Sequence, residues 1–252
     1  MKNITIADVA THAKVSKSTV SQYLNKRFDY MGESTRQRIE DAISTLGYQP
    51  NFVARSLKQK STKTIGVIVA SILHTFTTEV TRAIEDACIN EDYHTIICNA
   101  DNDPNKEKRY IDMLRSKQVD GMIIFPTGGN QELYEKMIEQ NFPVVFLDRF
   151  IEGLPISSLL LDNEKASRMA VDHLVEHGYK RIGLVTMSLK NKITPRIERI
   201  QGYKKALHSS GYLYGDRYIR SSEPGNIQEA IHNLMTQENP PDALIAGNDL
   251  VL

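Results

Sequence analysis

From residue 65 onward, short runs of β-branched and apolar residues alternate with longer amphipathic segments, and this alternation restricts the fold more than any other feature of the chain. The runs have the length of buried strands, and the segments between them place apolar residues on one helix face. Strands that alternate with helices form a parallel, doubly wound sheet. Strands are predicted at residues 65–69, 95–98, 121–125 and 144–147, and helices at residues 78–90, 104–116 and 131–140.

The same pattern restarts near residue 159, so the α/β core is expected to have two lobes. Lobe one is predicted to cover about residues 65–157 and lobe two about residues 158–252. The expected strands of lobe two are at residues 159–161, 181–185 and 243–246, and its helices are at residues 164–177, 199–209 and 227–236.

Polar and loop residues that follow these strands are candidates for a ligand site, because open α/β sheets bind ligands beyond the carboxyl ends of their strands. A cleft between two lobes is therefore the expected site. The candidates are Ser71, Leu73, Asp101, Asp162, Arg199, Asn248 and Asp249.

The first 60 residues have a different, all-helical pattern. Helices are predicted at residues 6–13 and 17–24, with Thr5 and Ser16 as their capping residues. Only Lys14 and Val15 lie between them, which gives a helix-turn-helix unit. An inward-facing Val20 leaves one face of the second helix free to contact base edges in a major groove, with Lys17, Ser18, Ser21 and Gln22 as the base-reading candidates.

A third helix is predicted to begin at Ser34, with Gln37 completing a capping box, and to end at Gly47. It would close a three-helix core. After Gly47 the chain continues through residues 52–57, which are too few to form a stable helix alone. A polar linker follows at residues 59–64. The expected domains are therefore a head at residues 1–58 and a core at residues 65–252.

Charge is distributed unevenly along the chain, although its formal net charge is zero. Residues 1–60 hold ten of the 31 Lys and Arg residues but only five of the 31 Asp and Glu residues. The head is therefore basic and the remainder acidic, as expected for a head that binds phosphates.

Other classes of protein are disfavoured by what the sequence contains. The amino terminus leads directly into a helical pattern rather than a signal peptide or membrane span, so we expect a cytoplasmic protein. Cys88 and Cys98 are expected to be core residues, and His173 and His177 share one helix face without an evident third ligand, so neither pair predicts a metal site. We expect no cofactor and no enzyme activity, since no nucleophile or phosphate-loop motif is recognisable.

The segment TIADVATHAKVSKSTVSQYLN, residues 5–25, resembles the DNA-binding head of the LacI/GalR family of bacterial regulators. Cap, turn and core positions agree together over the whole segment. RIQG at residues 199–202 and AGND at residues 246–249 also resemble effector-binding stretches of this family. Two positions depart from the family pattern: Lys14 stands where many relatives have Gly, and Gln22 where many have Arg, which predicts an altered operator base because Gln pairs with adenine.

The resemblance implies a hinge helix at PNFVARSL, residues 50–57, that orders on operator binding and inserts Leu57 into the minor groove. A plain linker with Leu57 packed on the core is the alternative. The DNA-binding residues are then expected to be Thr5, Ser16, Lys17, Ser18, Thr19, Ser21, Gln22, Asn25, Asn51, Ala54, Arg55 and Leu57.

The resemblance also implies lobes of the periplasmic-binding-protein type and a homodimer on a pseudo-palindromic DNA operator. It suggests a repressor of carbohydrate-utilisation genes, controlled by a sugar or sugar acid, with the ketodeoxygluconate-type repressors of bacilli as the suggested subgroup. Arg196 and Arg199 could then pair with a carboxylate of such a sugar acid, although a solvated surface charge is an equally plausible reading for Arg196. The chain ends where family members continue, so the second lobe is expected to be incomplete and to lack its C-terminal part. The alternatives are a truncated regulator with impaired dimerisation and sensing, or a sugar-binding α/β protein whose head does not bind DNA.

Overall fold

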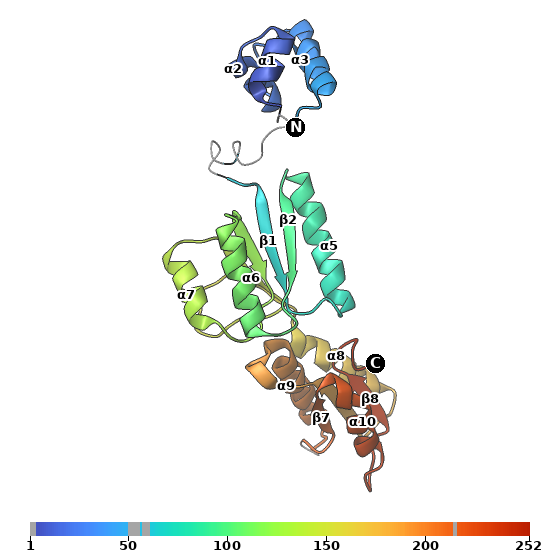
Figure 1. Cartoon of the computed structure of the whole chain (residues 1–252). Coiled ribbons are helices and arrows are strands. Elements are labelled where there is room, and N and C mark those ends of the chain that lie inside the picture. The colour runs from blue at the N-terminus through green and yellow to red at the C-terminus, as the bar shows by residue number, and fades with distance from the viewer. Residues whose placement is uncertain (1–3, 50–55, 57–60, 214–215) are drawn as a thin grey trace. The chain divides into compact units, whose positions relative to one another are not determined.

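The computed structural model describes residues 4–49, 56, 61–213 and 216–252. The chain divides into two compact units, Met1–Thr62 and Lys63–Leu252. The first contains three helices in its described part, and the second contains two α/β lobes (Figure 1). We refer to the two units as the head and the core.

In the head, helices α1 (Ile6–Ala13), α2 (Lys17–Leu24) and α3 (Glu33–Leu46) enclose a small apolar cluster. Val9, Val20 and Ile39 are fully buried in this cluster. The first two helices have the predicted bounds because their capping signals are local.

Two short contacts fix the starts of these helices. At α1, the Asp8 carboxylate accepts a hydrogen bond of 2.8 Å from the Thr5 amide. At α2, the Ser16 hydroxyl accepts one of 3.1 Å from the Thr19 amide. Between them, Lys14 ends α1 in the left-handed conformation, with φ at 54° and ψ at 47°, which is the conformation that glycine adopts most readily.

The predicted start of the third helix is wrong. Helix α3 begins at Glu33 after Gly32, so Ser34 lies within the first turn and does not cap it. A tertiary contact accounts for the earlier start: the Arg36 guanidinium donates to the carbonyls of Met31 and Phe28, each at 3.2 Å, and lies 4.3 Å from the centre of the Phe28 ring. These contacts hold the loop before α3.

Lobe one of the core is built on a parallel five-stranded sheet with the order β2-β1-β3-β4-β5. Val67 and Val69 point to one face, where they pack with residues of α5. Ile68 points to the other face, which α6 and α7 cover. The elements are β1 (Thr64–Val69), α5 (Thr75–Asn90), β2 (His94–Asn99), α6 (Pro104–Ser116), β3 (Gly121–Ile124), α7 (Gln131–Glu139), β4 (Val144–Leu147) and β5 (Ser158–Leu159).

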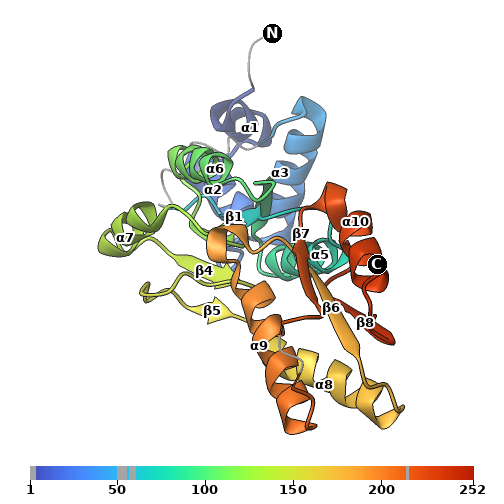
Figure 2. The ribbon, with the colours of Figure 1, turned by 90° about the horizontal axis from the view of Figure 1, so that it is seen from below.

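The strand near residue 159 belongs to this sheet and does not open lobe two as predicted. Phe146 pairs with Ser158 and Leu147 with Leu159, so β5 is the edge strand beside β4 (Figure 2). Both residues of β5 have exposed side chains. A strand this short and exposed has no hydrophobic pattern that could indicate which sheet it joins. It joins lobe one because the edge of β4 is free to pair with it.

Lobe two has a parallel three-stranded sheet with the order β7-β6-β8. Strand β7 was not predicted, because its sequence IRSS lacks the apolar run that identified the other strands. Helices α8 and α9 pack on one face of the sheet and α10 on the other. The elements are α8 (Asn163–Glu176), β6 (Ile182–Met187), α9 (Thr194–Ser209), β7 (Ile219–Ser222), α10 (Ile227–Met235) and β8 (Ala243–Ala246).

The doubly wound α/β architecture predicted for the core is therefore confirmed, as is the helical head. Among the described residues, no helix combines the length and apolar composition needed to span a bilayer. The described residues also hold no group of three or more His, Cys, Asp or Glu side chains arranged to bind a metal ion.

Candidate nucleic-acid interface and ligand pocket

Helix α2 presents a polar face on the side opposite its buried residue Val20. Lys17, Ser18 and Gln22 are exposed on this face, and Ser21 is half-buried beside them. The helix is held rigidly at both ends, because Ser16 caps its start and the Asn25 side chain donates to the Ser21 carbonyl at 2.7 Å. A short, fixed helix with a polar face can present several side chains to base edges at once.

The described candidates for DNA contact lie at the start of α1 and along α2 with its two caps. Thr5 precedes α1 and is exposed, whereas the other described candidates lie between Ser16 before α2 and Asn25 after it. The hinge candidates Asn51, Ala54, Arg55 and Leu57 lie outside the described residues.

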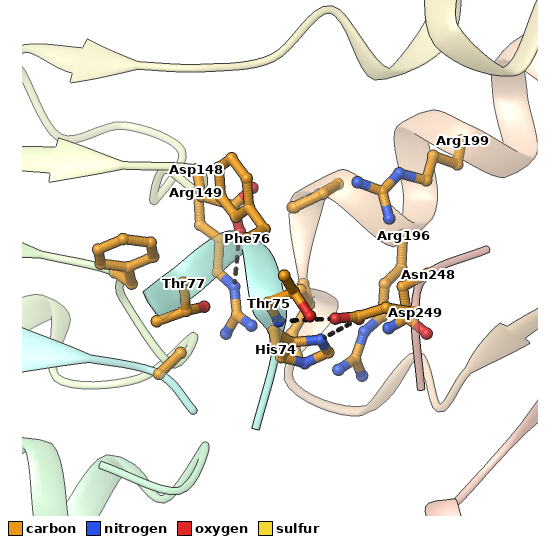
Figure 3. A pocket seen from close by; sticks show the side chains of 14 residues that line it. His74, Thr75, Phe76, Thr77, Asp148, Arg149, Arg196, Arg199, Asn248 and Asp249 are labelled. Carbon is orange, nitrogen blue, oxygen red and sulfur yellow. Dashed lines mark hydrogen bonds and ion pairs between the residues drawn. The ribbon is translucent and has the colours of Figure 1, made fainter. Parts of the chain in front are cut away.

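The core contains a pocket with a volume of about 270 Å³ (Figure 3). Lobe one contributes residues from the ends of β1, β3 and β4 and from the start of α5, while lobe two contributes the start of α9 and the loop after β8. The pocket thus lies at the carboxyl ends of strands from both lobes, where the topology predicts it. Its lining residues are Ala70, His74, Thr75, Phe76, Thr77, Phe125, Asp148, Arg149, Ile193, Pro195, Arg196, Arg199, Asn248 and Asp249.

Half of the predicted ligand residues line this pocket, namely Arg196, Arg199, Asn248 and Asp249. The other half have different surroundings. Ser71 is buried and its hydroxyl accepts from the Leu73 amide at 3.3 Å, while the Leu73 side chain is exposed. Asp101 forms a surface ion pair with Lys106, and Asp162 caps α8 by accepting from the Lys165 amide at 2.9 Å.

Sequence reasoning missed the lobe-one side chains of this pocket, above all His74, Asp148 and Arg149. Asp148 and Arg149 directly follow β4, so they obey the same carboxyl-end rule that selected residues after other strands. That rule, applied to β4 as well, would have found them. His74 gives no comparable signal, because its role depends on a residue far away in the sequence.

Arg149 is the most enclosed charge in the pocket, with 6% of the residue exposed. Its guanidinium donates to the Asn102 side-chain oxygen at 3.0 Å and to the Pro126 carbonyl at 3.3 Å, and lies 3.6 Å from the Asp148 carboxylate. Burial lowers the pKa of Arg149 and raises the pKa of Asp148, while their opposite charges partly offset both effects.

Arg196 and Arg199 extend from α9 into the same pocket (Figure 3). Arg199 donates to the Asn163 side-chain oxygen at 2.9 Å and also to the Gly247 carbonyl. Arg196 donates to the Ser188 carbonyl. Burial, together with the like charges of Arg149 and Arg199, lowers the pKa of Arg196 to about 10, so it remains a cation at neutral pH.

The Asp249 carboxylate bridges the two lobes at the edge of the pocket. It accepts from the His74 ring at 2.6 Å and from the Thr75 amide at 2.8 Å. Burial raises the pKa of Asp249, but these hydrogen bonds outweigh burial and hold the pKa below its ordinary value.

Comparison with known proteins agrees with both parts of this structure. Residues 5–51 match the family described as bacterial regulatory proteins, lacI family. Residues 62–252 match the periplasmic binding proteins and sugar binding domain of LacI family. The chain belongs to the LacI family.

Individual relatives support this assignment. The chain is 49% identical over 249 residues to the probable HTH-type transcriptional regulator EndR of Paenibacillus polymyxa, a match that covers 98% of this chain and 73% of the relative. It is 35% identical to catabolite control protein A of Priestia megaterium over 98% of this chain and 74% of that protein. The Lac repressor bound to ONPG in its repressed state has a TM-score of 0.81 at 26% identity, covering 99% of this chain and 76% of the repressor.

Membership of the LacI family makes this protein a DNA-binding transcriptional regulator with a sugar-binding type of core. The predicted resemblance is thereby confirmed at the level of the family. The ketodeoxygluconate-type subgroup stays a prediction, as do the individual contact residues.

Proposed function

We propose that this LacI-family regulator represses carbohydrate-utilisation genes and that a small anionic sugar derivative, bound in the core pocket, controls its operator affinity. The observation that carries the proposal is the convergence of three guanidinium groups, those of Arg149, Arg196 and Arg199, on one pocket. The pocket also contains the two carboxylates of Asp148 and Asp249. Even with His74 neutral, the cations outnumber the anions.

The uneven pairing of these arginines favours an anionic ligand. Arg149 has Asp148 as a partner at 3.6 Å. Arg196 instead donates to a neutral carbonyl. Burial and the like charges of Arg149 and Arg199 lower its pKa, and the carboxylates of Glu223 and Asp148 offset this only in part. Guanidinium groups bind carboxylates and phosphates through charge-assisted and often bidentate hydrogen bonds. A carboxylate or phosphate of a sugar would therefore stabilise Arg196, while the polar and aromatic lining, including Phe76 and Phe125, suits the sugar ring.

Calorimetric titration tests the ligand class. Gluconate and glucose 6-phosphate, which carry a carboxylate and a phosphate, are compared with uncharged glucose as probes. We expect one of the anions to bind and glucose to bind at least about tenfold more weakly, because each charge-assisted hydrogen bond contributes on the order of 1.5–3 kcal/mol. Arg196→Met should abolish that preference. Arg168→Met, on the exposed side of α8, is the matched control and should bind as the parent does.

Equal binding of charged and neutral sugars by the parent protein, unchanged in Arg196→Met, would overturn the anionic class. The link to DNA requires a second measurement, operator affinity with and without the bound probe. A ligand alters that affinity only if it binds the two conformations of the protein differently. An effector that binds but leaves operator affinity unchanged would contradict control by this pocket.

For DNA, we propose that two copies of the head read the half-sites of a pseudo-palindromic operator through α2. Gln22 is exposed on that helix and its amide can pair bidentately with adenine, whereas Arg pairs with guanine. Selection from random duplexes should therefore recover an adenine at one position in each half-site, and Gln22→Arg should change that position to guanine. An unchanged preference in Gln22→Arg would show that Gln22 does not read a base.

We also propose that the pocket binds its ligand without transforming it, and that the protein acts in the bacterial cytoplasm. The relatives named above support this, because they are transcriptional regulators. Recovery of the bound sugar unchanged after prolonged incubation with the protein would test the first statement.

A further inference from the structure

We propose that Asp249 is a latch between the lobes, whose carboxylate holds lobe two against the start of α5. This assigns Asp249 a positioning role rather than the direct ligand contact that its place after β8 suggests. The latch does not depend on the identity of the effector.

The geometry uses both oxygens of one carboxylate. Oδ1 of Asp249 lies 2.6 Å from Nδ1 of His74, and Oδ2 accepts from the Thr75 amide at 2.8 Å. His74 and Thr75 belong to lobe one, and Asp249 follows the last strand of lobe two (Figure 3). One side chain thus connects segments separated by 175 positions in the sequence.

Asp249 supplies the acceptor for an amide at the start of helix α5. The first amides of any helix lack partners within the helix, and an acidic side chain near them is favourable. Helix α5, which the structure describes in full, has no acidic residue in its first turn and no side-chain cap from His74. The carboxylate that fills this position comes from the other lobe.

Burial raises the pKa of Asp249, but the hydrogen bonds from His74 and Thr75 outweigh burial and favour its ionised form. The Asp249 charge in turn favours the cationic form of Arg199 in α9. The side chain of His74 is 14% exposed and that of Asp249 is 36% exposed. Because Asp249 and His74 both line the pocket, breaking their contact would separate the lobes at the edge of the pocket.

These contacts stabilise the arrangement in which the lobes meet at Asp249, and an effector acts on an equilibrium that Asp249 also biases. Replacement of Asp249 by Asn removes the charge and leaves only one acceptor for two donors. Replacement by Ala removes both contacts. Either change should increase the population with separated lobes, and the Ala variant should do so more strongly.

Spin-label distance measurements can detect this change without DNA or sugar, so their result is independent of the proposed function. Labels are attached to cysteines introduced at the exposed positions Lys136 of α7 and Asn233 of α10, with Cys88→Ser and the buried Cys98 retained. The labelled full chain is diluted into unlabelled chain, so that pairs within one copy dominate. We expect one narrow distribution for the parent and a shift to longer, broader distances in Asp249→Asn and Asp249→Ala.

Asp242→Ala is the matched control, because the Asp242 carboxylate also accepts from a backbone amide, that of Arg181 at 2.8 Å, but does so within lobe two. It should leave the interlobe distance unchanged. Circular dichroism verifies that each variant is folded. In hydrogen exchange, the Thr75 amide should exchange faster in Asp249→Asn than in the parent or in Asp242→Ala. Folded Asp249 variants with the parental distance distribution would overturn the latch.

Discussion

The candidate DNA-contact surface of the head and the pocket of the core are assembled in opposite ways. Most described candidates for DNA contact lie between Ser16 and Asn25, on a single helix and its caps. The residues that line the pocket come from positions between Ala70 and Asp249 and from both lobes. A surface made by one helix follows from local periodicity, whereas a pocket made by many strand ends exists only after the sheets have formed.

This difference predicts where substitutions act. Changes in the head should alter stability through caps and backbone conformation. Changes in the core should act through contacts between residues far apart in sequence.

The largest effect is expected for Gly202→Ala in α9. A Cβ at this position would lie 2.3 Å from the carbonyl oxygen and 2.6 Å from the Cα of Glu164 in α8. Because these are backbone atoms, the two helices would have to separate, which should lower the free energy of unfolding of the core by about 3 kcal/mol. Urea unfolding followed by circular dichroism measures the loss.

Gly225→Ala is the control for this prediction, since its Cβ would have no described atom within 4 Å. Its stability should remain within about 0.5 kcal/mol of the parent. Equal unfolding midpoints for the two variants would mean that the close approach of α8 and α9 does not constrain the core.

A smaller loss is expected for Glu107→Gln in lobe one. The fully buried Glu107 carboxylate accepts from the Thr127 amide at 2.7 Å, and from the Tyr134 hydroxyl and the Asn130 side chain, each at 2.9 Å. A Gln side chain cannot accept at both of its terminal atoms, so we expect a loss of about 2 kcal/mol.

The same variant should change the pH dependence of stability. Burial raises the pKa of Glu107, although its hydrogen bonds oppose the rise. The native state therefore keeps this proton to higher pH than the unfolded state, so the parent loses stability as pH rises from 4.5 through the native pKa. Gln has no such titration, and the deficit of Glu107→Gln should shrink as pH rises.

Urea midpoints at several pH values would measure this trend, with the exposed Glu139→Gln as the control. A deficit that grows with pH would contradict the raised pKa of Glu107.

In the head, Ser16→Ala should lower stability by about 1 kcal/mol, because it leaves the Thr19 amide without its capping partner. Ser34→Ala tests the contrast between predicted and observed caps, since Ser34 lies inside the first turn of α3. It should change stability by no more than about 0.5 kcal/mol. Thermal unfolding of both variants measures the two losses of stability. Equal losses would contradict the assignment of Ser16, and not Ser34, as a helix cap.

The smallest effect is expected for Lys14→Gly, and it has the opposite sign. Lys14 has φ at 54°, and relief of this left-handed strain should outweigh the greater chain entropy of glycine by about 0.5 kcal/mol. His12→Gly, two residues earlier on an exposed position inside α1, should instead destabilise the head by about 1 kcal/mol. Destabilisation of the head by both substitutions would show that the turn conformation carries no measurable strain.

Several features could be predicted because they depend on neighbours in the chain. The bounds of α1 and α2 follow from helical spacing and from the caps at Thr5 and Ser16. The α/β alternation follows from the length and composition of apolar runs. Arg199, Asn248 and Asp249 could be placed at the pocket since open α/β sheets bind ligands beyond the carboxyl ends of their strands, and the family resemblance adds Arg196.

Other features required the tertiary structure. The start of α3 depends on Arg36 holding the preceding loop, and the placement of β5 depends on the free edge of β4. The start of α5 at Thr75 coincides with the contact to Asp249 from the other lobe.

The sequence by itself therefore determined the helices and strands that have a clear apolar pattern, β7 excepted, and that a basic helical head precedes an α/β core. Only the tertiary structure decided which strands are neighbours, which arginines share a pocket and which carboxylate connects the lobes. The physical reason is the range of the interactions. Caps and amphipathic spacing act within a few residues, whereas sheet edges and buried charges find partners that the chain brings together only on folding.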